Sequence, residues 1–304
     1  MKTKLLLDSG DPQEYKEASE LLKSHGQELW GSTTNPSLIA KKLSDVPAGS
    51  QGKKLTPKDA FALQKALVLE IVEIVPGAVS AEVYSDLVTS SEEMIEQGRD
   101  IATWHERVVV KLPTTLEGFK ARTILRREGI AINNTLVFSQ EQIFAICLHE
   151  KIVLQQFNPK PILFPTFISP FVGRLDDKGE NGMVLVAHGM QIKNNYFAPN
   201  QTWMLEASIR SISHVNKGLE LGTELMTLPI KIVREMVENP QHVNDEQLPK
   251  LIDIPLWQPG PELLNIKSVD EFMEIIENGK LNIQHDLTTA GIEKFVADWK
   301  AILT

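Results

Sequence analysis

Short apolar runs alternate with segments of helical period along this chain, and this alternation constrains the fold more than any other feature. Each run is followed by a polar break and an amphipathic stretch, as in repeated strand–helix units. The predicted strands are Leu5–Leu7, Leu29–Thr33, Val79–Val83, Val108–Pro113, Ile130–Phe138, Ile162–Ser169, Trp203–Ile209 and Glu224–Leu228. Strands joined by helices pair in parallel, and eight such units close a barrel. We therefore predict an α/β fold, a (β/α)8 TIM barrel, with a doubly wound open sheet as the alternative.

The segments between and after these strands are predicted to be helical. Helices are expected at about Pro12–His25, a short stretch ending near Leu43, Pro57–Val75, Glu92–Gly98, Glu117–Arg127, Gln140–Glu150, Met183–Asn194, Ile212–Leu219, Ile230–Val237, Val269–Asn278 and Ile292–Leu303. The Pro/Gly-rich stretch Pro47–Gly52 is expected to be a surface connection. We expect residues 1–304 to form a single barrel domain whose additional C-terminal helices, about 266–304, pack on the barrel.

Charge and composition exclude several classes of protein. A net charge of −9 argues against wholesale binding of nucleic acid or of an anionic membrane, so an anionic ligand has to be met by a few placed basic groups. Residues Met1–Leu7 lack the apolar core of a signal peptide, and no long uncharged apolar stretch follows. The single cysteine, Cys147, excludes an intrachain disulfide and lies in an apolar helical stretch, where a packed side chain is expected. We expect a cytoplasmic protein.

Lys111 interrupts the apolar run Val108–Pro113, which has the composition of a strand buried on both faces. Burial of an amine disfavours its charged form, and a neutral amine can attack a carbonyl to form a Schiff base. The alternative is a lysine at a strand end whose ammonium group lies in solvent. The other predicted strands favour the first interpretation.

Polar residues stand at the ends of nearly all the predicted strands, which is where a β/α barrel carries its working residues. They are Asp8, Asn35, Glu82, Lys111, the pair Asn133 and Thr135, Ser169 followed by Arg174, and the pair Ser208 and Arg210. Several have a structural explanation when taken singly, as Asn35 does before a proline. A carboxylate inside a strand, such as Glu82, needs a partner.

Together these groups permit aldol chemistry of class I on a phosphorylated sugar. A neutral lysine attacks a ketone, while Asp8 and Glu82 share the acid and base roles. Arg174 and Arg210 grip a phosphate, and Asn and Ser side chains orient hydroxyls. Neither a metal nor a cofactor is expected, since the iminium is itself the electron sink; the seven histidines are scattered, without the spacing of metal ligands.

These motifs resemble those of the transaldolase family. The resemblance lies in the segments LLLDSGD, STTNPSLI, VSAEV, VVVKLPTTLEGFKA, EGIAINNTLVFS, SPFVGRLDD and ASIRS, in family order between Leu5 and Ser211. It covers about two thirds of the chain, and the lysine segment and SPFVGR are specific when found together.

The resemblance implies roles for individual residues. Lys111 would form the Schiff base, Asp8 would take the proton of the C4 hydroxyl, and Glu82 with Thr135 would hold a water. The groups that hold the dihydroxyacetone unit would be Asn35, Asn133 and Ser169, with Phe171 beside them, and the phosphate grip would be Arg174, Ser208 and Arg210.

The resemblance also implies substrates. A dihydroxyacetone unit would pass from sedoheptulose 7-phosphate or fructose 6-phosphate to an aldose phosphate, as in the pentose phosphate pathway. The alternative is a fructose-6-phosphate aldolase that releases free dihydroxyacetone. Relatives of that kind carry glutamine in place of Glu82 and tyrosine in place of Phe171, so this chain favours transfer. A catalytically idle sugar-phosphate-binding protein would have lost the lysine or a carboxylate, and neither is lost.

Two features depart from the family pattern. The proline-containing segment Lys151–Phe167 is longer than the usual turn, so either it is a structured insertion or the sixth strand begins later. Glu206, two residues before Ser208, is expected on the same face but deeper, where it would repel a phosphate; it stays unexplained at this level. The sequence leaves open whether the chain forms a homo-oligomer.

Overall fold

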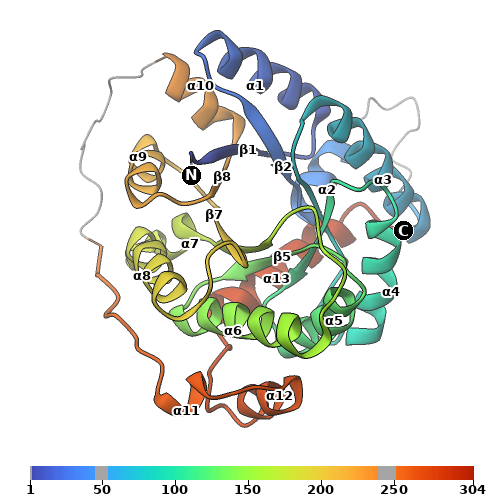
Figure 1. Cartoon of the computed structure of the whole chain (residues 1–304). Coiled ribbons are helices and arrows are strands. Elements are labelled where there is room, and N and C mark those ends of the chain that lie inside the picture. Colours follow the sequence, from blue (N-terminus) through green and yellow to red (C-terminus); the bar gives the residue numbers. More distant parts are fainter. Residues whose placement is uncertain (1, 45–53, 239–250) are drawn as a thin grey trace.

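The strands form a closed parallel barrel. The computed structural model describes residues 2–44, 54–238 and 251–304, so the predicted connection Pro47–Gly52 lies outside the described residues. Each strand pairs in parallel with the next one in sequence, and β8 pairs with β1 to close the ring (Figure 1). The prediction of a (β/α)8 barrel is confirmed, and the open sheet is excluded.

The register of the strands brings predicted site residues side by side. The strands are β1 Lys4–Asp8, β2 Leu29–Thr33, β3 Val79–Glu82, β4 Val108–Pro113, β5 Ile132–Val137, β6 Thr166–Pro170, β7 Thr202–Glu206 and β8 Leu225–Leu228. Glu82 of β3 is level with Lys111 of β4, and Lys111 is level with Asn133 of β5. Neighbouring residues in register share a face of a sheet, so these three side chains converge on the barrel interior.

Helices surround the barrel, and local sequence fixes where they begin. They are α1 Pro12–Ser24, α2 Pro36–Ser44, α3 Pro57–Ile74, α4 Ser91–Ala102, α5 Leu116–Arg127, α6 Gln140–Phe157, α7 Val172–Asp176, α8 Gly182–Tyr196, α9 Ile212–Leu221, α10 Ile230–Glu238, α11 Pro261–Leu264, α12 Val269–Glu277 and α13 Asp286–Lys300. Asp11 caps α1 with Pro12 in its first turn, and Ser139 forms a capping box with Gln142 at α6. The short helix α7 was not predicted.

The segment Lys151–Phe167, which departs from the family pattern, forms the end of a helix and the start of a strand that begins later than predicted. The predicted helix Gln140–Glu150 continues to Phe157, because no helix-breaking residue intervenes. Asn158 then ends it in the left-handed conformation, at φ 45°, and the prolines follow. The sixth strand begins at Thr166, not at Ile162 as predicted. The longer helix and the late strand together account for the extra length.

The amino-terminal end of the barrel interior is filled by aromatic side chains. Phe167 and Trp203 stack with their ring centroids 6.0 Å apart, and Trp30 packs edge-on against Trp203 at 6.3 Å. Lys4 places its ammonium 4.7 Å from the centre of the Trp30 ring. Because this end of the barrel is packed, a ligand can enter only from the carboxyl ends of the strands.

The C-terminal helix α13 lies across the carboxyl end of the barrel, whereas α11 and α12 lie outside the ring of helices (Figure 1). Both ends of α13 are fixed to the barrel. Near its start, Thr288 donates a hydrogen bond of 2.9 Å to the carbonyl of Leu136, at the end of β5. Near its end, the Ser37 hydroxyl of α2 donates to the Asp298 carboxylate. α13 is thereby held beside the cavity at the carboxyl ends of the strands.

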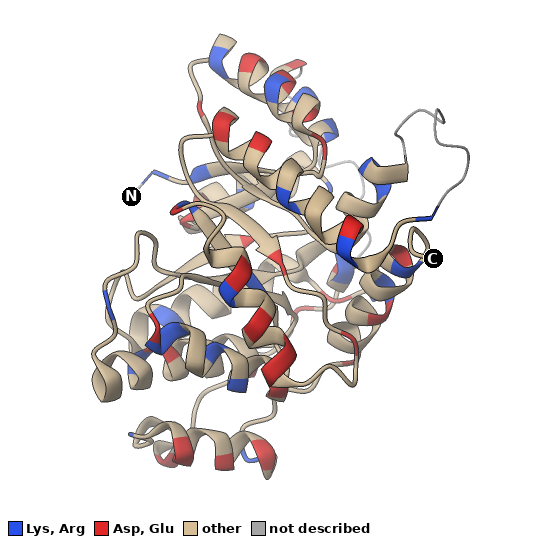
Figure 2. Cartoon of the chain, turned by 90° about the vertical axis from the view of Figure 1, so that its right-hand side faces the viewer, with Lys and Arg blue, Asp and Glu red and all other residues tan. Residues whose placement is uncertain are grey.

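Figure 2 shows basic and acidic residues interspersed on the outer helices of the face it presents. Among the described residues, no helix is both long enough and apolar enough to cross a membrane.

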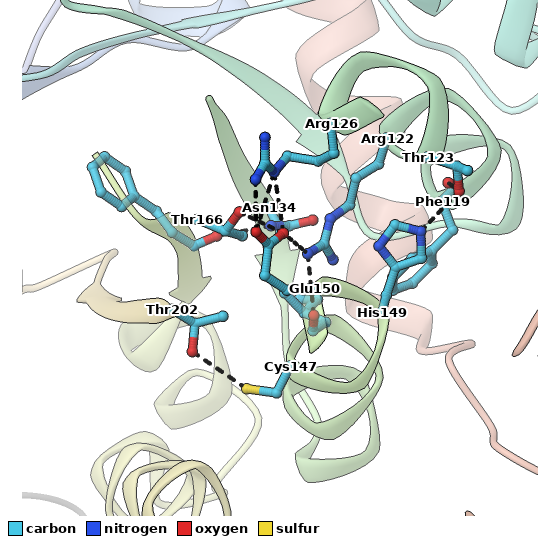
Figure 3. A network of polar contacts seen from close by, with 12 residues as sticks. Phe119, Arg122, Thr123, Arg126, Asn134, Cys147, His149, Glu150, Thr166 and Thr202 are labelled. Atoms are coloured by element: carbon cyan, nitrogen blue, oxygen red, sulfur yellow. Dashed lines mark hydrogen bonds and ion pairs between the residues drawn. The ribbon is translucent and has the colours of Figure 1, made fainter. Parts of the chain in front are cut away.

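A buried ionic network joins α5 and α6 behind the sheet (Figure 3). Glu150 accepts hydrogen bonds from Arg126 at 2.8 Å, Arg122 at 3.0 Å and Thr166 at 2.9 Å. Burial alone would raise the pKa of Glu150, but the hydrogen bond from Arg126 and the charges of both arginines hold it below its ordinary value. The network fixes two helices to β6 on the outer side of the sheet, away from the cavity.

Candidate active site

A cavity of about 210 Å³ opens at the carboxyl ends of the strands and collects most of the predicted site residues. Those that line it are Asp8, Asn35, Lys111, Ser169, Phe171, Arg174, Ser208 and Arg210. Glu82, Asn133 and Thr135 lie behind this first layer. The cavity is lined by a carboxyl group, an amine and two guanidinium groups, as expected of a site for a polar anionic ligand.

Lys111 is buried on the floor of the cavity and is held by two groups. Its Nζ lies 2.9 Å from Oε2 of Glu82 and donates a hydrogen bond of 3.0 Å to the carbonyl of Thr34. The Lys111 and Glu82 side chains are each only 3% exposed. The alternative of a strand-end lysine with its ammonium group in solvent is therefore wrong, because the apolar strand carries the whole side chain inward.

Asp8 lies at the end of β1 on the wall of the cavity. Its Oδ1 accepts a hydrogen bond of 2.7 Å from the Thr33 hydroxyl. Burial raises the pKa of Asp8 above its ordinary value, against the opposing effects of the Lys111 charge and of this hydrogen bond. A carboxyl group with a raised pKa can both accept and return a proton near neutral pH.

Glu82 is the second carboxyl group of the site. Burial raises its pKa, although the neighbouring Lys111 charge opposes the shift. Close by in the register, Thr135 of β5 is fully buried, and its Oγ1 has no hydrogen-bond partner among the described residues. A buried hydroxyl without a protein partner fits one that hydrogen-bonds to a water. The structure does not bring Thr135 into direct hydrogen-bond contact with Glu82.

Asn133 and Ser169 form one polar unit on neighbouring strands. Ser169 donates a hydrogen bond of 2.7 Å to Oδ1 of Asn133, whose Nδ2 donates to the Ser80 hydroxyl at 3.0 Å. Asn133 is thereby held in one orientation behind the cavity wall. Asn35 is held differently, since its Oδ1 accepts from the amide of Leu38 at the start of α2 and its Nδ2 is left for a ligand.

The guanidinium end of the cavity is built after β6 and β7. Arg174 of α7 lies 5.2 Å from the ring centroid of Phe171, whereas Arg210 is more exposed and pairs with Asp177 at 2.5 Å. The seventh strand was predicted to run through Ser208, but it ends at Glu206, and Ser208 has a φ of 59°. Ser208 and Arg210 therefore reach the cavity from a turn, not from one face of a strand as predicted.

The expectation for Glu206 is wrong. Leu205 faces the cavity, and Glu206 points outward against α9. Its Oε2 lies so close to Gly218 of that helix that a Cβ built on the glycine would be only 2.0 Å away. The left-handed turn at Ser208 breaks the alternation on which the expectation depended. Glu206 is thus shielded from any phosphate in the cavity. Burial raises its pKa well above the ordinary value.

Five residues that line the cavity were not among the predicted site residues: Thr33, Leu205, Ala207, Thr227 and Phe295. Thr33 donates to Asp8 and lies 2.6 Å from the Thr227 hydroxyl. Thr33 ends β2 and Thr227 is the last residue but one of β8, so the strand-end argument could have found both threonines. Phe295 comes from α13, and no local pattern in the sequence marks it.

The remaining chemical groups fit structural roles. Burial raises the pKa of Cys147 to about 11, in keeping with the packed side chain expected for it. Within the described parts of the chain, no three His, Cys, Asp or Glu side chains gather as metal ligands would.

Comparison with known proteins decides the family. Residues 5–304 match the family model described as transaldolase/fructose-6-phosphate aldolase. The chain belongs to this family. A probable transaldolase of Caldicellulosiruptor saccharolyticus is 38% identical over 237 residues, which cover 78% of this chain and 90% of the relative. Those of Chlorobium phaeobacteroides and Herpetosiphon aurantiacus are 36% and 34% identical, over 82% and 86% of this chain and 96% and 98% of the relatives.

Membership of the transaldolase/fructose-6-phosphate aldolase family makes the chain an enzyme of the transaldolase type. The family match spans all the strands but the first residue of β1, and α13 as well. The resemblance seen in the sequence motifs is confirmed at this level.

Proposed function

We propose that this enzyme is a transaldolase that carries a dihydroxyacetone unit on Lys111 between a ketose phosphate and an aldose phosphate. The observation that carries the proposal is the buried pair of Lys111 and Glu82, 2.9 Å apart, in which Lys111 lines a cavity that Arg174 and Arg210 also line. An amine paired with a proton acceptor suits attack on a ketone, and two guanidinium groups suit a phosphate.

The proposed reaction begins with proton transfer from Lys111 to Glu82. The neutral amine adds to the C2 carbonyl of the ketose, and the carbinolamine then loses water to give the iminium. Glu82 supplies the proton for the departing hydroxyl, and a water at Thr135 relays protons in this step. The raised pKa of Glu82 supports its exchange of a proton within the working range of pH.

Carbon–carbon cleavage is proposed to use Asp8. Its carboxylate takes the proton of the C4 hydroxyl, the C3–C4 bond breaks, and the bonding electrons pass into the iminium to give an enamine. The aldose phosphate leaves, and the enamine attacks the aldehyde of the acceptor while Asp8 returns the proton. Asn35, Asn133 and Ser169 hold the hydroxyls of the bound unit, with Ser208 beside the phosphate. No metal or cofactor enters this scheme, because the iminium accepts the electron pair.

The substrates proposed are sedoheptulose 7-phosphate or fructose 6-phosphate as donor and an aldose phosphate as acceptor, as in the pentose phosphate pathway. Glu82 and Phe171 stand where the resemblance favours transfer over release of free dihydroxyacetone. A cytoplasmic location suits these metabolites.

Release of glyceraldehyde 3-phosphate from fructose 6-phosphate, measured with and without erythrose 4-phosphate, tests the proposal. Sustained release only with the acceptor supports transaldolase, and equal release without it supports the aldolase alternative. Borohydride reduction in the presence of fructose 6-phosphate is expected to label the wild type and not Lys111→Met. Labelling of Lys111→Met would place the Schiff base on another residue.

A further inference from the structure

We propose that α13 forms part of the substrate-binding site, and that its residues Phe295 and Gly291 position Arg174 for the substrate phosphate. The C-terminal helix would thereby set the preference for phosphorylated over unphosphorylated ketones. This inference rests on the proposed function and assigns to it two positioning residues outside the strand ends.

Arg174 is held mainly by aromatic rings. Its Cζ lies 5.2 Å from the ring centroid of Phe171 and 5.3 Å from that of Phe295. No hydrogen bond or ion pair joins its guanidinium to another residue in the described parts of the chain. An aromatic ring can orient a guanidinium group through cation–π attraction without using its N–H donors. The donors of Arg174 are therefore left for an anion.

Gly291 makes room for this arrangement. A Cβ at Gly291 would lie 2.7 Å from Nη1 of Arg174 and 2.5 Å from Cδ2 of Leu136. Both distances are too short for any side chain, so even an alanine would push the guanidinium or Leu136 aside. The absence of a side chain on this turn of α13 lets Arg174 take its position.

Phe295 also borders the reacting end of the cavity. Its ring centroid lies 5.9 Å from Nζ of Lys111, and its side chain is only 5% exposed. One ring thus touches both the amine and the phosphate-binding end. Because α13 is fixed at Thr288 and Asp298, the ring cannot withdraw without detaching the helix from the barrel.

Arg210 provides the contrast. Its guanidinium is 45% exposed and pairs with Asp177, a surface carboxylate that competes with a phosphate for its donors. Exposed pairs of this kind are weak. Of the two arginines, Arg174 is therefore the one whose orientation is set in advance, by Phe171 on one side and by Phe295 of α13 on the other.

The experiment compares Phe295→Leu with the wild type on phosphorylated and unphosphorylated ligands. We expect the KM for fructose 6-phosphate to rise about tenfold with kcat within about twofold, since a desolvated cation–π contact is of that order. Borohydride trapping with dihydroxyacetone, which has no phosphate, is expected to fall by a smaller factor than trapping with fructose 6-phosphate, because only the phosphate depends on Arg174. Phe295→Tyr, which keeps the ring, is expected to restore the wild-type KM.

Gly291→Ala tests the same inference through a variant that keeps the Phe295 ring. Alanine favours helix over glycine, but its Cβ would crowd Leu136 and Arg174, so the KM for fructose 6-phosphate should rise. Phe272→Leu removes a buried ring of α12 that lies away from the cavity and is expected to lower stability without changing this KM.

Binding of inorganic phosphate by calorimetry separates the inference from the proposed function. If Phe295→Leu binds phosphate more weakly than the wild type does, the inference is supported, whether or not the wild type turns over fructose 6-phosphate. A wild type that does not turn over fructose 6-phosphate would contradict only the proposed function. The inference would be overturned if Phe295→Leu reduced borohydride trapping by the same factor with fructose 6-phosphate and with dihydroxyacetone. So would phosphate binding that is unchanged in Phe295→Leu or absent in the wild type.

Discussion

Nζ of Lys111 lies 2.9 Å from Oε2 of Glu82, and the two residues are level neighbours on adjacent strands. The contact is therefore fixed by the backbone register of β3 and β4 and does not depend on a flexible loop. The backbone carbonyl of Glu82 also accepts a hydrogen bond of 3.1 Å from Gln64 of α3, which fixes the strand end from outside. Amine and carboxyl group thus form a single unit built into the sheet.

Glu82→Gln is expected to lower kcat on fructose 6-phosphate by about 100-fold or more, the usual effect of losing a general acid–base group. The amide keeps the shape of the side chain but cannot accept the proton that the Lys111 ammonium has to lose. Stopped-flow formation of the Schiff base measures this step directly. A rate of Schiff-base formation equal to that of the wild type would show that Glu82 acts elsewhere.

Asp177→Asn is expected to lower the KM for fructose 6-phosphate by a factor of about 1.4 to 5. Asp177 pairs with Arg210 at 2.5 Å and so competes with a phosphate for that guanidinium. The range follows from the small free energy of exposed ion pairs, about 0.2–1 kcal/mol. Kinetics at low and high salt provide the check, because the difference should shrink as salt screens the pair. A rise in KM would mean that Asp177 positions Arg210 instead.

The barrel and most of the site could be predicted because both depend on short-range patterns. Strand–helix alternation fixes the parallel topology, and parallel strands deliver their carboxyl ends to one rim. Asp8 and Lys111 reach the cavity for this reason alone. Their roles in turnover remain predictions until the kinetics are measured.

Features that depend on tertiary packing could not be predicted. Phe295 lies on a helix that crosses the barrel only after many intervening residues, and nothing near it in the sequence marks that path. Glu206 was assigned to the wrong side because the strand was extended through Ser208, whose left-handed backbone breaks the alternation. For Phe295 the decisive contact joins segments distant in the sequence, whereas for Glu206 the decisive feature is a left-handed backbone conformation at a serine, which the sequence does not mark.

Glu206 predicts a pH dependence of stability. Burial without a partner among the described residues raises its pKa well above the ordinary value of 4.5. The folded state then holds a proton that the unfolded state releases, so this group's contribution to stability falls as the pH rises above about 4.5, until the folded-state pKa is passed.

Glu206→Gln is expected to raise the free energy of unfolding more at pH 8 than at pH 5, because the amide cannot ionise. Glu206→Met cannot ionise either and also removes both buried polar atoms, so it should add about 1–3 kcal/mol of stability beyond Glu206→Gln at either pH. Urea unfolding at the two pH values measures both effects. A Glu206→Gln variant with the same pH dependence as the wild type would assign that dependence to other groups.

Glu150→Gln is expected to destabilise the fold by about 3–5 kcal/mol, because it leaves the buried Arg122 and Arg126 without a counter-charge. Glu128→Gln is the matched control: Glu128 pairs with Arg99 on the surface, where the loss should be within about 1 kcal/mol.

The pH dependence gives Glu150 a second, independent signature. Its pKa is held below 4.5 in the folded state, so its contribution is present above that pH and is lost as the pH falls through the folded-state value. The difference in free energy of unfolding between the wild type and Glu150→Gln, measured with urea, should therefore shrink in acid. The KM at 25 °C should stay unchanged, because the network lies outside the cavity. A loss no larger than that of Glu128→Gln would mean that the two arginines find water or other partners, and that the network contributes little to stability.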